Sequence, residues 1–125
     1  MNIEHIALYV QDLEGARDFF VRWFGGIPNE GYHNRKTDFR SYFLCFGDGS
    51  RLELMTRPGL EPGREGCLGY AHLAFSAGSA EAVDSLTAQL AQAGYAVLSG
   101  PRVTGDGYYE SCVRGFEGIL IEITI

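Results

Sequence analysis

The sequence lacks the features that mark several large protein classes. Its 125 residues carry ten Lys and Arg against sixteen Asp and Glu, which gives a formal net charge of −6. No basic stripe is present to neutralise phosphates, so nucleic-acid binding is not expected. A polybasic attachment to a membrane surface is not expected either. No apolar run approaches the ~20 residues that a membrane-spanning helix needs.

Cysteine is also scarce. Three cysteines, at positions 45, 67 and 112, are an odd number and are widely spaced. Such a set does not form the disulfide framework of a small secreted domain. We expect Cys45, Cys67 and Cys112 to be reduced thiols, packed or incidental rather than nucleophilic, in a cytoplasmic protein. The first residues show no charged segment followed by a long apolar run, so a signal peptide is not expected.

What the sequence does contain is an internal repeat. A hydrophobic content of 46% is enough for one compact domain. The run that begins at His5 recurs at His72, and Tyr42 and Cys45 recur as Tyr109 and Cys112, all at an offset of 67 residues. A later segment, 49–54, recurs as 118–123 at an offset of 69. The change of offset predicts that the second copy has gained two residues in one hairpin.

Hydrophobic periodicity predicts the same elements in both copies. In the first copy, a strand at 2–10 precedes a helix that is capped by Asp12 and ends at Gly25-Gly26. In the second copy, Ser79 caps a helix that ends at Gly94. The remaining expected elements are a strand at 27–33, a turn at 34–38, strands at 39–46 and 51–56 around a hairpin turn at 47–49, a strand at 70–77, the second helix at 80–93, and strands at 95–99, 107–114 and 119–125.

These patterns predict an α+β fold made of two tandem βαβββ modules within one domain, residues 1–125. Module one covers 1–57 and module two covers 70–125. The Pro- and Gly-containing segment 58–69 lacks periodicity and is predicted to be the linker. Each module is expected to form a small, mostly antiparallel sheet with its helix on the outer face.

Strand alternation places four titratable residues on the faces opposite the helices. Large apolar side chains alternate with His5 and His72 in the opening strands. In the closing strands, Leu52 and Leu54 flank Glu53. Glu122 likewise lies between isoleucines. If the two copies are related by a pseudo-twofold axis, the four side chains converge on one cavity.

Two imidazoles and two carboxylates form a mixed nitrogen and oxygen donor set. That set suits a divalent ion such as Ni, Co, Zn, Mn or Fe rather than a thiolate-seeking metal. A lone His in a strand is more often structural or solvated, and a buried unpaired carboxylate is costly. Recurrence of both residue types in a duplicated frame favours a metal site at His5, Glu53, His72 and Glu122. His33 has no counterpart in the other copy and is excluded from the set.

At these residues the sequence resembles the vicinal-oxygen-chelate superfamily, which includes glyoxalase I, extradiol dioxygenases, epimerases, fosfomycin-modifying enzymes and bleomycin-binding proteins. The opening run from His5 to Leu13 is similar to the family's first strand and helix cap. The turn at 115–118 followed by Glu122 is similar to its closing turn and ligand strand. The resemblance covers essentially the whole chain. It implies two βαβββ modules that form a cupped sheet around a metal.

The ligand types narrow what the resemblance implies. A His, Glu, His, Glu set is typical of bacterial glyoxalase I and matches the four residues named above. It implies a metal-dependent lyase or isomerase in which Glu122, with Glu53 as its counterpart, moves a proton through a metal-bound enediolate. The alternatives are another metalloenzyme of the superfamily, an epimerase or extradiol-type dioxygenase, or a non-catalytic binding protein for a small molecule such as an antibiotic.

The substrate is left open by the sequence. Glyoxalase I often has an Arg where this chain has Tyr9, so use of glutathione does not follow. Basic residues available for an anionic substrate, or for surface solvation, are Arg35, Lys36, Arg40, Arg57 and Arg102. The expected partners are a small-molecule substrate and a second copy of the chain. A homodimer is favoured because single cupped modules leave sheet edges exposed.

Overall fold

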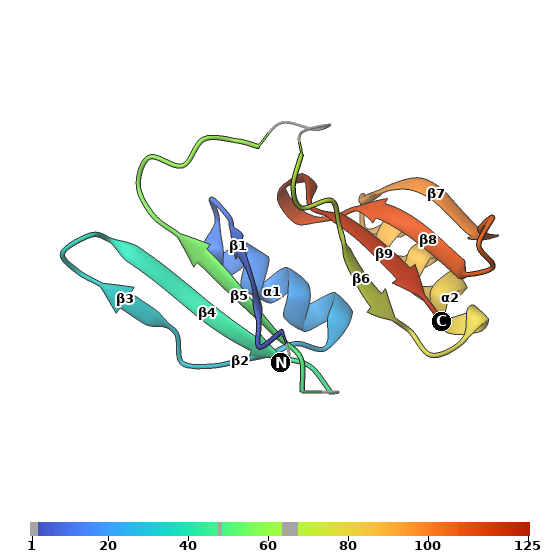
Figure 1. The fold of residues 1–125 in the computed structure, drawn as a ribbon, viewed down its shortest axis with the longest axis horizontal. Coiled ribbons are helices and arrows are strands. Elements are labelled where there is room, and N and C mark those ends of the chain that lie inside the picture. The colour runs from blue at the N-terminus through green and yellow to red at the C-terminus, as the bar shows by residue number, and fades with distance from the viewer. Residues whose placement is uncertain (1–2, 48, 64–67) are drawn as a thin grey trace. The chain divides into compact units, whose positions relative to one another are not determined.

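The computed structural model describes residues 3–47, 49–63 and 68–125. The chain divides into two compact units, Met1–Gly66 and Cys67–Ile125, and we describe each by itself (Figure 1). Each unit contains one sheet and one α-helix, which confirms the predicted α+β class. The division falls at the C-terminal end of the segment predicted as the linker, 58–69. None of the helices in the described ranges is long and apolar enough to span a bilayer.

The sheet of the first unit has the order β1-β5-β4-β2, and β3 also pairs with β4. β1 runs parallel to β5, and the other pairings are antiparallel. β1 is shorter than the strand expected at 2–10. The elements of this unit are β1 (Ile6–Tyr9), α1 (Leu13–Phe24), β2 (Ile27–Pro28), β3 (Tyr32–Asn34), β4 (Phe39–Cys45) and β5 (Arg51–Thr56).

The strand expected at 27–33 is in fact two short strands, β2 and β3, and Asn29 explains the interruption. Its side-chain oxygen accepts hydrogen bonds from the backbone N–H groups of Gly31 and Phe43 at 3.1 and 3.0 Å. The side chain therefore replaces a regular ladder contact, as Asn side chains do in turns. Both short strands still pair with β4, so the edge of the sheet is bent rather than lost.

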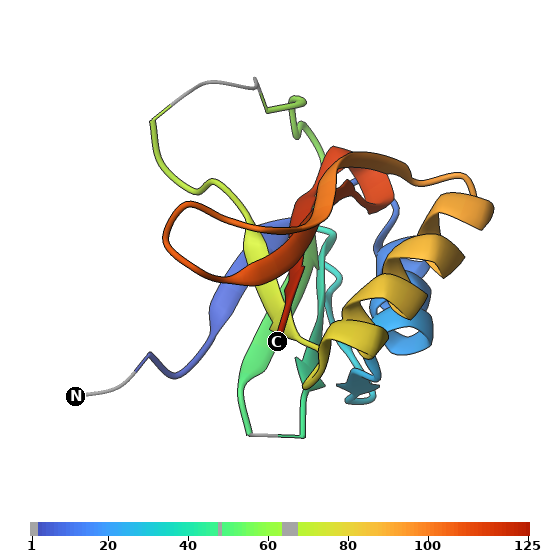
Figure 2. The same ribbon diagram turned by 90° about the vertical axis from the view of Figure 1, so that its right-hand side faces the viewer.

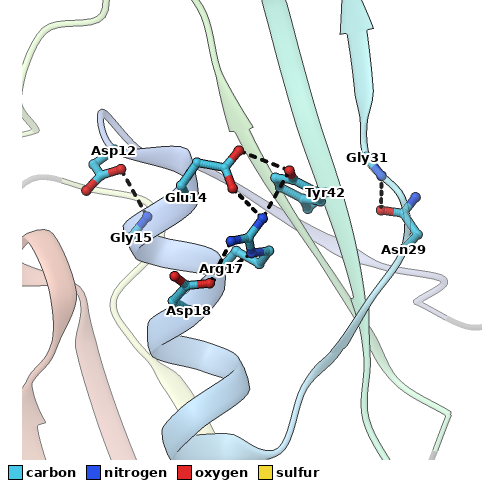
Figure 3. A network of polar contacts seen from close by, with 8 residues as sticks. All are labelled: Asp12, Glu14, Gly15, Arg17, Asp18, Asn29, Gly31 and Tyr42. Carbon is cyan, nitrogen blue, oxygen red and sulfur yellow. Dashed lines mark hydrogen bonds and ion pairs between the residues drawn. The ribbon is translucent and has the colours of Figure 1, made fainter.

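Helix α1 begins and ends where the sequence predicts. The Asp12 carboxylate accepts a hydrogen bond from the N–H of Gly15 at 3.0 Å, and Gly25 adopts the left-handed conformation with φ of 66°. Across the helix–sheet layer, the Tyr42 hydroxyl on β4 donates to Glu14 at 3.0 Å and accepts from Arg17 at 3.2 Å (Figure 3). The buried side of the helix is formed by Leu13, Ala16, Phe19 and Phe20.

The second unit has a four-stranded sheet of order β6-β9-β8-β7, with β6 parallel to β9. Ser79 caps α2 as predicted, because its hydroxyl oxygen accepts from the N–H of Ala82 at 3.2 Å. The yellow-orange helix lies along one face of its own sheet in Figure 2, and contacts β7, β8 and β9. The elements are β6 (Leu73–Ser76), α2 (Ala80–Gln92), β7 (Ala96–Val103), β8 (Tyr109–Arg114), a short 3₁₀ turn η1 (Phe116–Gly118) and β9 (Leu120–Thr124).

Strand β7 continues to Val103, beyond the end expected at position 99. Its pairing with β8 shifts register twice, between Val97 and Ser99 and again between Ser99 and Arg102, the interval that contains Gly100. Gly100 has φ of +78°, and a Cβ there would lie 2.4 Å from the carbonyl oxygen of Glu110. Only glycine permits this close approach of two backbones, so the glycine that reads as a strand terminator instead forms an irregularity within the strand.

The strand registers correct the predicted position of the two extra residues. Glu53 pairs with Phe43 and Glu122 pairs with Cys112, ten residues apart in both hairpins. Phe43 is therefore the counterpart of Cys112, and the expected equivalence of Cys45 with Cys112 and of Tyr42 with Tyr109 is wrong. The two residues are gained at the end of the second helix. Thirteen positions separate the Asp12 cap from left-handed Gly25, and fifteen separate the Ser79 cap from left-handed Gly94.

Burial confirms the predicted alternation in the closing strands. Leu52, Leu54, Ile121 and Ile123 are at most 3% exposed and form the helix-facing core. The opening strand of the first unit follows the pattern less well. Ile6 was expected on the buried face but is 40% exposed, because it lies at the start of β1, whereas Val10 beyond the end of the strand is buried.

Candidate metal centre

The first His–Glu pair, His5 and Glu53, lies on the sheet face opposite α1. His5 directly precedes β1, and Ala7, two residues later, pairs with Glu53 on β5. This register puts the two side chains on one face. Nε2 of His5 lies 3.8 Å from Oε2 of Glu53. The Glu53 side chain is only 15% exposed, whereas that of His5 is 36% exposed.

Three further residues surround His5. One carboxylate oxygen of Glu4 contacts Nδ1 of His5, and the other contacts the guanidinium of Arg51. The ring of Phe43 meets the His5 imidazole edge to face at 5.2 Å, and the Arg51 guanidinium lies 4.5 Å from the same ring. The hydrogen bond from His5, with the charge of Arg51, lowers the pKa of Glu4 and keeps it ionised. Nε of Arg51 is buried without a hydrogen-bond acceptor among the described residues, so Phe43 and Glu4 hold this side chain.

The second His–Glu pair, His72 and Glu122, has the same arrangement. Ala74, two residues after His72, pairs with Glu122 on β9, as Ala7 pairs with Glu53. Nε2 of His72 lies 3.2 Å from Oε2 of Glu122. Both side chains are partly accessible, at 41% and 24%. The prediction that each His shares a face with its Glu is therefore met within each unit.

Cys112 lies beside the second pair, directly across the strand from Glu122. Burial raises the pKa of its thiol, and the negative charges of Glu122 and Glu110 raise it further. Cys112 is therefore a protonated thiol near neutral pH rather than an activated nucleophile. Cys45 is exposed, and both Cys45 and Cys112 are free thiols, while Cys67 lies outside the described residues.

The donor atoms of each pair have a spacing that a divalent ion can bridge. Two donors that are each about 2.1 Å from one ion lie about 3.0 to 4.2 Å apart, depending on the angle at the ion. Both separations, 3.8 and 3.2 Å, fall in this range. Among the described residues, no group of three or more His, Cys, Asp or Glu side chains is arranged to hold an ion. Each unit thus offers two donors.

Other candidate residues have different roles. Nε2 of His33 lies 2.8 Å from Asp38, and its strand β3 pairs with the edge of β4 opposite β5. Among the basic residues considered for an anionic substrate, Arg40 forms an ion pair with Asp38 at 3.0 Å. The guanidinium of Arg57 lies 5.5 Å from the ring of Tyr9.

Sequence reasoning missed the residues that support His5. Glu4 precedes the histidine directly, and Arg51 precedes Glu53 by two residues, which puts Arg51 on the same sheet face. This two-residue spacing could have predicted from the sequence that Arg51 shares a sheet face with Glu53. Phe43 could not be found in the same way, because its pairing with Glu53 depends on the length of the hairpin.

A separate hollow lies on the helix side of the first unit. Its volume is about 160 Å³, and neither His5 nor Glu53 lines it. Its wall includes carboxylates and phenol rings from α1, the β2–β3 connection, β3 and β4, namely Glu14, Glu30, Tyr32 and Tyr42. Glu14 is already engaged by Arg17 and Tyr42, and His33 and Arg40, which also line the hollow, both contact Asp38.

Comparison with known proteins shows what the two units resemble. The chain is 35% identical over 127 residues to the Bacillus subtilis protein YqjT, described as uncharacterized, covering 97% of this chain and 96% of that protein. The structure matches trypanothione-dependent glyoxalase I of Leishmania major with a TM-score of 0.80, at 19% identity and over 99% and 86% of the two chains. It matches the fosfomycin resistance protein FosX of Listeria monocytogenes, complexed with Mn(II) and sulfate, with a TM-score of 0.74, at 20% identity and over 98% and 90%.

The two structural matches are below 25% identity and therefore concern the fold. The family assignment comes from the sequence, because residues 2–123 match the family model. That match covers both His–Glu pairs and both helices. The chain belongs to the Glyoxalase/Bleomycin resistance protein/Dioxygenase superfamily.

Proposed function

We propose that this protein is a divalent-metal-dependent, glyoxalase I-like lyase or isomerase that acts on a small oxygenated substrate. His5, Glu53, His72 and Glu122 are the proposed metal ligands. One observation carries the proposal: the same His–Glu pair occurs in both units, with Nε2 facing Oε2 in each. Each histidine keeps its carboxylate at the same sheet register, although the residues around the two pairs differ.

The donor chemistry fits a divalent first-row ion. Imidazole nitrogen and carboxylate oxygen suit Ni, Co, Zn, Mn or Fe, and no thiolate belongs to either pair. Four protein ligands require one pair from each of two units, supplied by one chain or by a homodimer. When bound, the ion supplies a Lewis acid toward substrate oxygens. The FosX structure, on the same fold, is a complex with Mn(II).

The proton transfer is assigned to the carboxylates of the two pairs. Glu122 is the proposed base that takes a proton from one substrate carbon and returns it to the neighbouring carbon, with Glu53 as its counterpart. The two differ in accessibility: the side chain of Glu122 is 24% exposed and that of Glu53 is 15% exposed. The more open carboxylate is the better placed to reach a substrate.

Elemental analysis of the purified, untagged protein is the first test. The proposal expects about one divalent ion for every two His–Glu pairs, and Ni or Co would favour the glyoxalase-type reaction. Iron together with oxygen consumption would move the assignment to the dioxygenases. Absence of any tightly held ion after loading with Ni²⁺, Mn²⁺ or Zn²⁺ would favour a binding protein without turnover.

Substitution of the proposed base is the second test. Glu122→Gln is expected to lower kcat at least about a thousandfold while the fold is kept, because an amide cannot take up the proton. The measurement is uptake of solvent deuterium next to the carbonyl in a panel of α-oxygenated carbonyl compounds, with and without glutathione. Glu61→Gln removes the same charge at an exposed position and serves as the control. Unchanged turnover in Glu122→Gln would rule out this role.

A further inference from the structure

We propose that Glu4, held by Arg51, fixes His5 in the tautomer whose Nε2 lone pair faces Glu53. The first unit then presents a preorganised His–Glu pair, and the second unit presents a pair that must rearrange before it can bind an ion. This inference rests on the proposed metal function. It assigns positioning roles to Glu4 and Arg51, neither of which is a proposed metal ligand.

The tautomer follows from the chemistry of Glu4. An ionised carboxylate has no hydrogen to donate, so the ring nitrogen that it contacts must carry one. Glu4 contacts Nδ1 of His5, which makes Nδ1 the protonated nitrogen in the neutral ring. Nε2 is then the nitrogen with the lone pair. Metal-binding histidines commonly use this arrangement, in which the second ring N–H donates to a carboxylate.

Nε2 of His5 is also free of a competing hydrogen bond to Glu53. Their separation of 3.8 Å is too long for one. The imidazole also packs edge to face against Phe43, which restricts its rotation. The same Phe43 ring supports Arg51, which holds the second oxygen of Glu4. Glu4, Arg51 and Phe43 therefore form one continuous support for His5.

None of these supports exists at the equivalent positions of the second unit. Ala71 stands where the first unit has Glu4, because both residues directly precede the histidine. The strand register puts Leu120 in the place of Arg51 and Cys112 in the place of Phe43. No carboxylate contact to Nδ1 of His72 is found among the described residues.

The histidine of the second unit is therefore free to adopt the other tautomer. Nε2 of His72 lies 3.2 Å from Oε2 of Glu122, closer than the 3.8 Å between His5 and Glu53, so the charge of the Glu122 carboxylate favours a proton on Nε2 in the metal-free protein. That proton must leave before Nε2 can donate its lone pair to an ion. The two His–Glu pairs are thus alike in ligand type but differ in which imidazole nitrogen carries the proton.

The direct test is the tautomer of each histidine in untagged, metal-free protein labelled with ¹⁵N in the imidazole rings. Long-range ¹H–¹⁵N spectra at neutral pH distinguish a ring protonated at Nδ1 from one protonated at Nε2. We expect His5 to be predominantly Nδ1–H and His72 to be predominantly Nε2–H. Glu4→Ala should convert His5 to a mixture of tautomers. Arg51→Leu, which introduces the residue of the second unit, should do so to a smaller extent.

A reciprocal variant tests the same support in the other unit. Ala71→Glu introduces the missing carboxylate and should increase the Nδ1–H population of His72. Titration with Ni²⁺ in a calorimeter should show a loss of affinity of about tenfold to a hundredfold in Glu4→Ala, the usual effect of removing such a partner. The control is Glu61→Ala, which removes the same charge at an exposed position without touching either pair.

The outcomes separate this inference from the metal proposal. If the wild-type protein takes up no divalent ion, the metal function is wrong, while the spectra still decide whether Glu4 sets the tautomer. If the ring signals of His5 are the same in Glu4→Ala as in the wild type, the positioning role of Glu4 is wrong, whatever the metal content. A change in tautomer in Glu4→Ala but not in Glu61→Ala supports the inference.

Discussion

In the first unit, the imidazole of His5 lies between the Glu4 carboxylate and the ring of Phe43, whereas in the second unit His72 follows Ala71 and shares its sheet face with Cys112. The backbone registers around the two histidines are the same. The comparison shows that a duplicated frame can keep its ligands while the residues that support them differ. Ligand identity and ligand support are therefore separate properties of this fold.

The two units also differ in the side chains that pack between the helix and the sheet. In the first unit, Phe20 on α1 is fully buried, and Tyr42 on β4 reaches the helix surface. The equivalent positions in the second unit are Thr87 and Ser111, whose buried hydroxyls are 2.6 Å apart. Two aromatic rings in one unit are replaced by a pair of small polar side chains in the other. The second unit therefore depends more on one buried hydrogen bond.

The largest expected effect on stability is at the hydrophobic cores, where the two units are alike. Leu54 and Ile123 occupy equivalent core positions and are both 0% exposed. Leu54→Ala and Ile123→Ala should each lower the free energy of unfolding by about 2–5 kcal/mol, through lost burial and the cavity left behind. Denaturant titration measures the change. Val103→Ala, at a position 67% exposed, should have little effect. A large loss for one core substitution and almost none for the other would contradict the equivalence of the two cores.

An intermediate effect on stability is expected at the buried hydroxyl pair of the second unit, where the two units differ. Thr87→Ala should cost about 1–3 kcal/mol of unfolding free energy, because it leaves the buried Ser111 hydroxyl without its partner. Adding Ser111→Ala should recover part of the loss, because the unpaired group is then removed. Ser85→Ala, at an exposed position on the same helix, is the control. An additive double variant would show that the two hydroxyls are not coupled.

The smallest effect concerns Cys112, which occupies the place of Phe43. Its raised pKa means that the thiolate forms only at higher pH, so alkylation at pH 8 should be slow. Glu122→Gln removes a neighbouring negative charge, which lowers the pKa, and alkylation should accelerate about twofold to fivefold. The rate is measured against pH in a Cys45→Ser, Cys67→Ser background, so that only Cys112 reacts. An unchanged rate profile in Glu122→Gln would show that the charge of Glu122 does not contribute to the raised pKa of Cys112.

Local signals predicted much of this fold. Asp12 and Ser79 marked both helix starts, since an N-cap acts through its own side chain on the next turn. Alternation around Glu53 and Glu122 assigned their faces correctly, because strand parity needs no knowledge of neighbouring strands. The His–Glu contacts within each unit followed from these two local rules.

Features that depend on pairing between strands were not predicted. The equivalence of Phe43 with Cys112 requires the register of two hairpins, which single-strand periodicity does not contain. The break at Asn29 and the irregularity at Gly100 arise from one side chain and one close backbone contact. Glu4 as a partner of His5 was missed because an exposed acidic residue in an opening segment is ordinarily a solvated one.

The two residues gained at the end of α2 lie in the outer layer, and both sheets keep the same spacing between their paired rows. A change in chain length at the end of the helix leaves the strand registers of the sheet unchanged. Each paired position on β1, β4 and β5 therefore has a defined counterpart on β6, β8 and β9. Side chains can therefore be exchanged one at a time between equivalent strand positions of the two units.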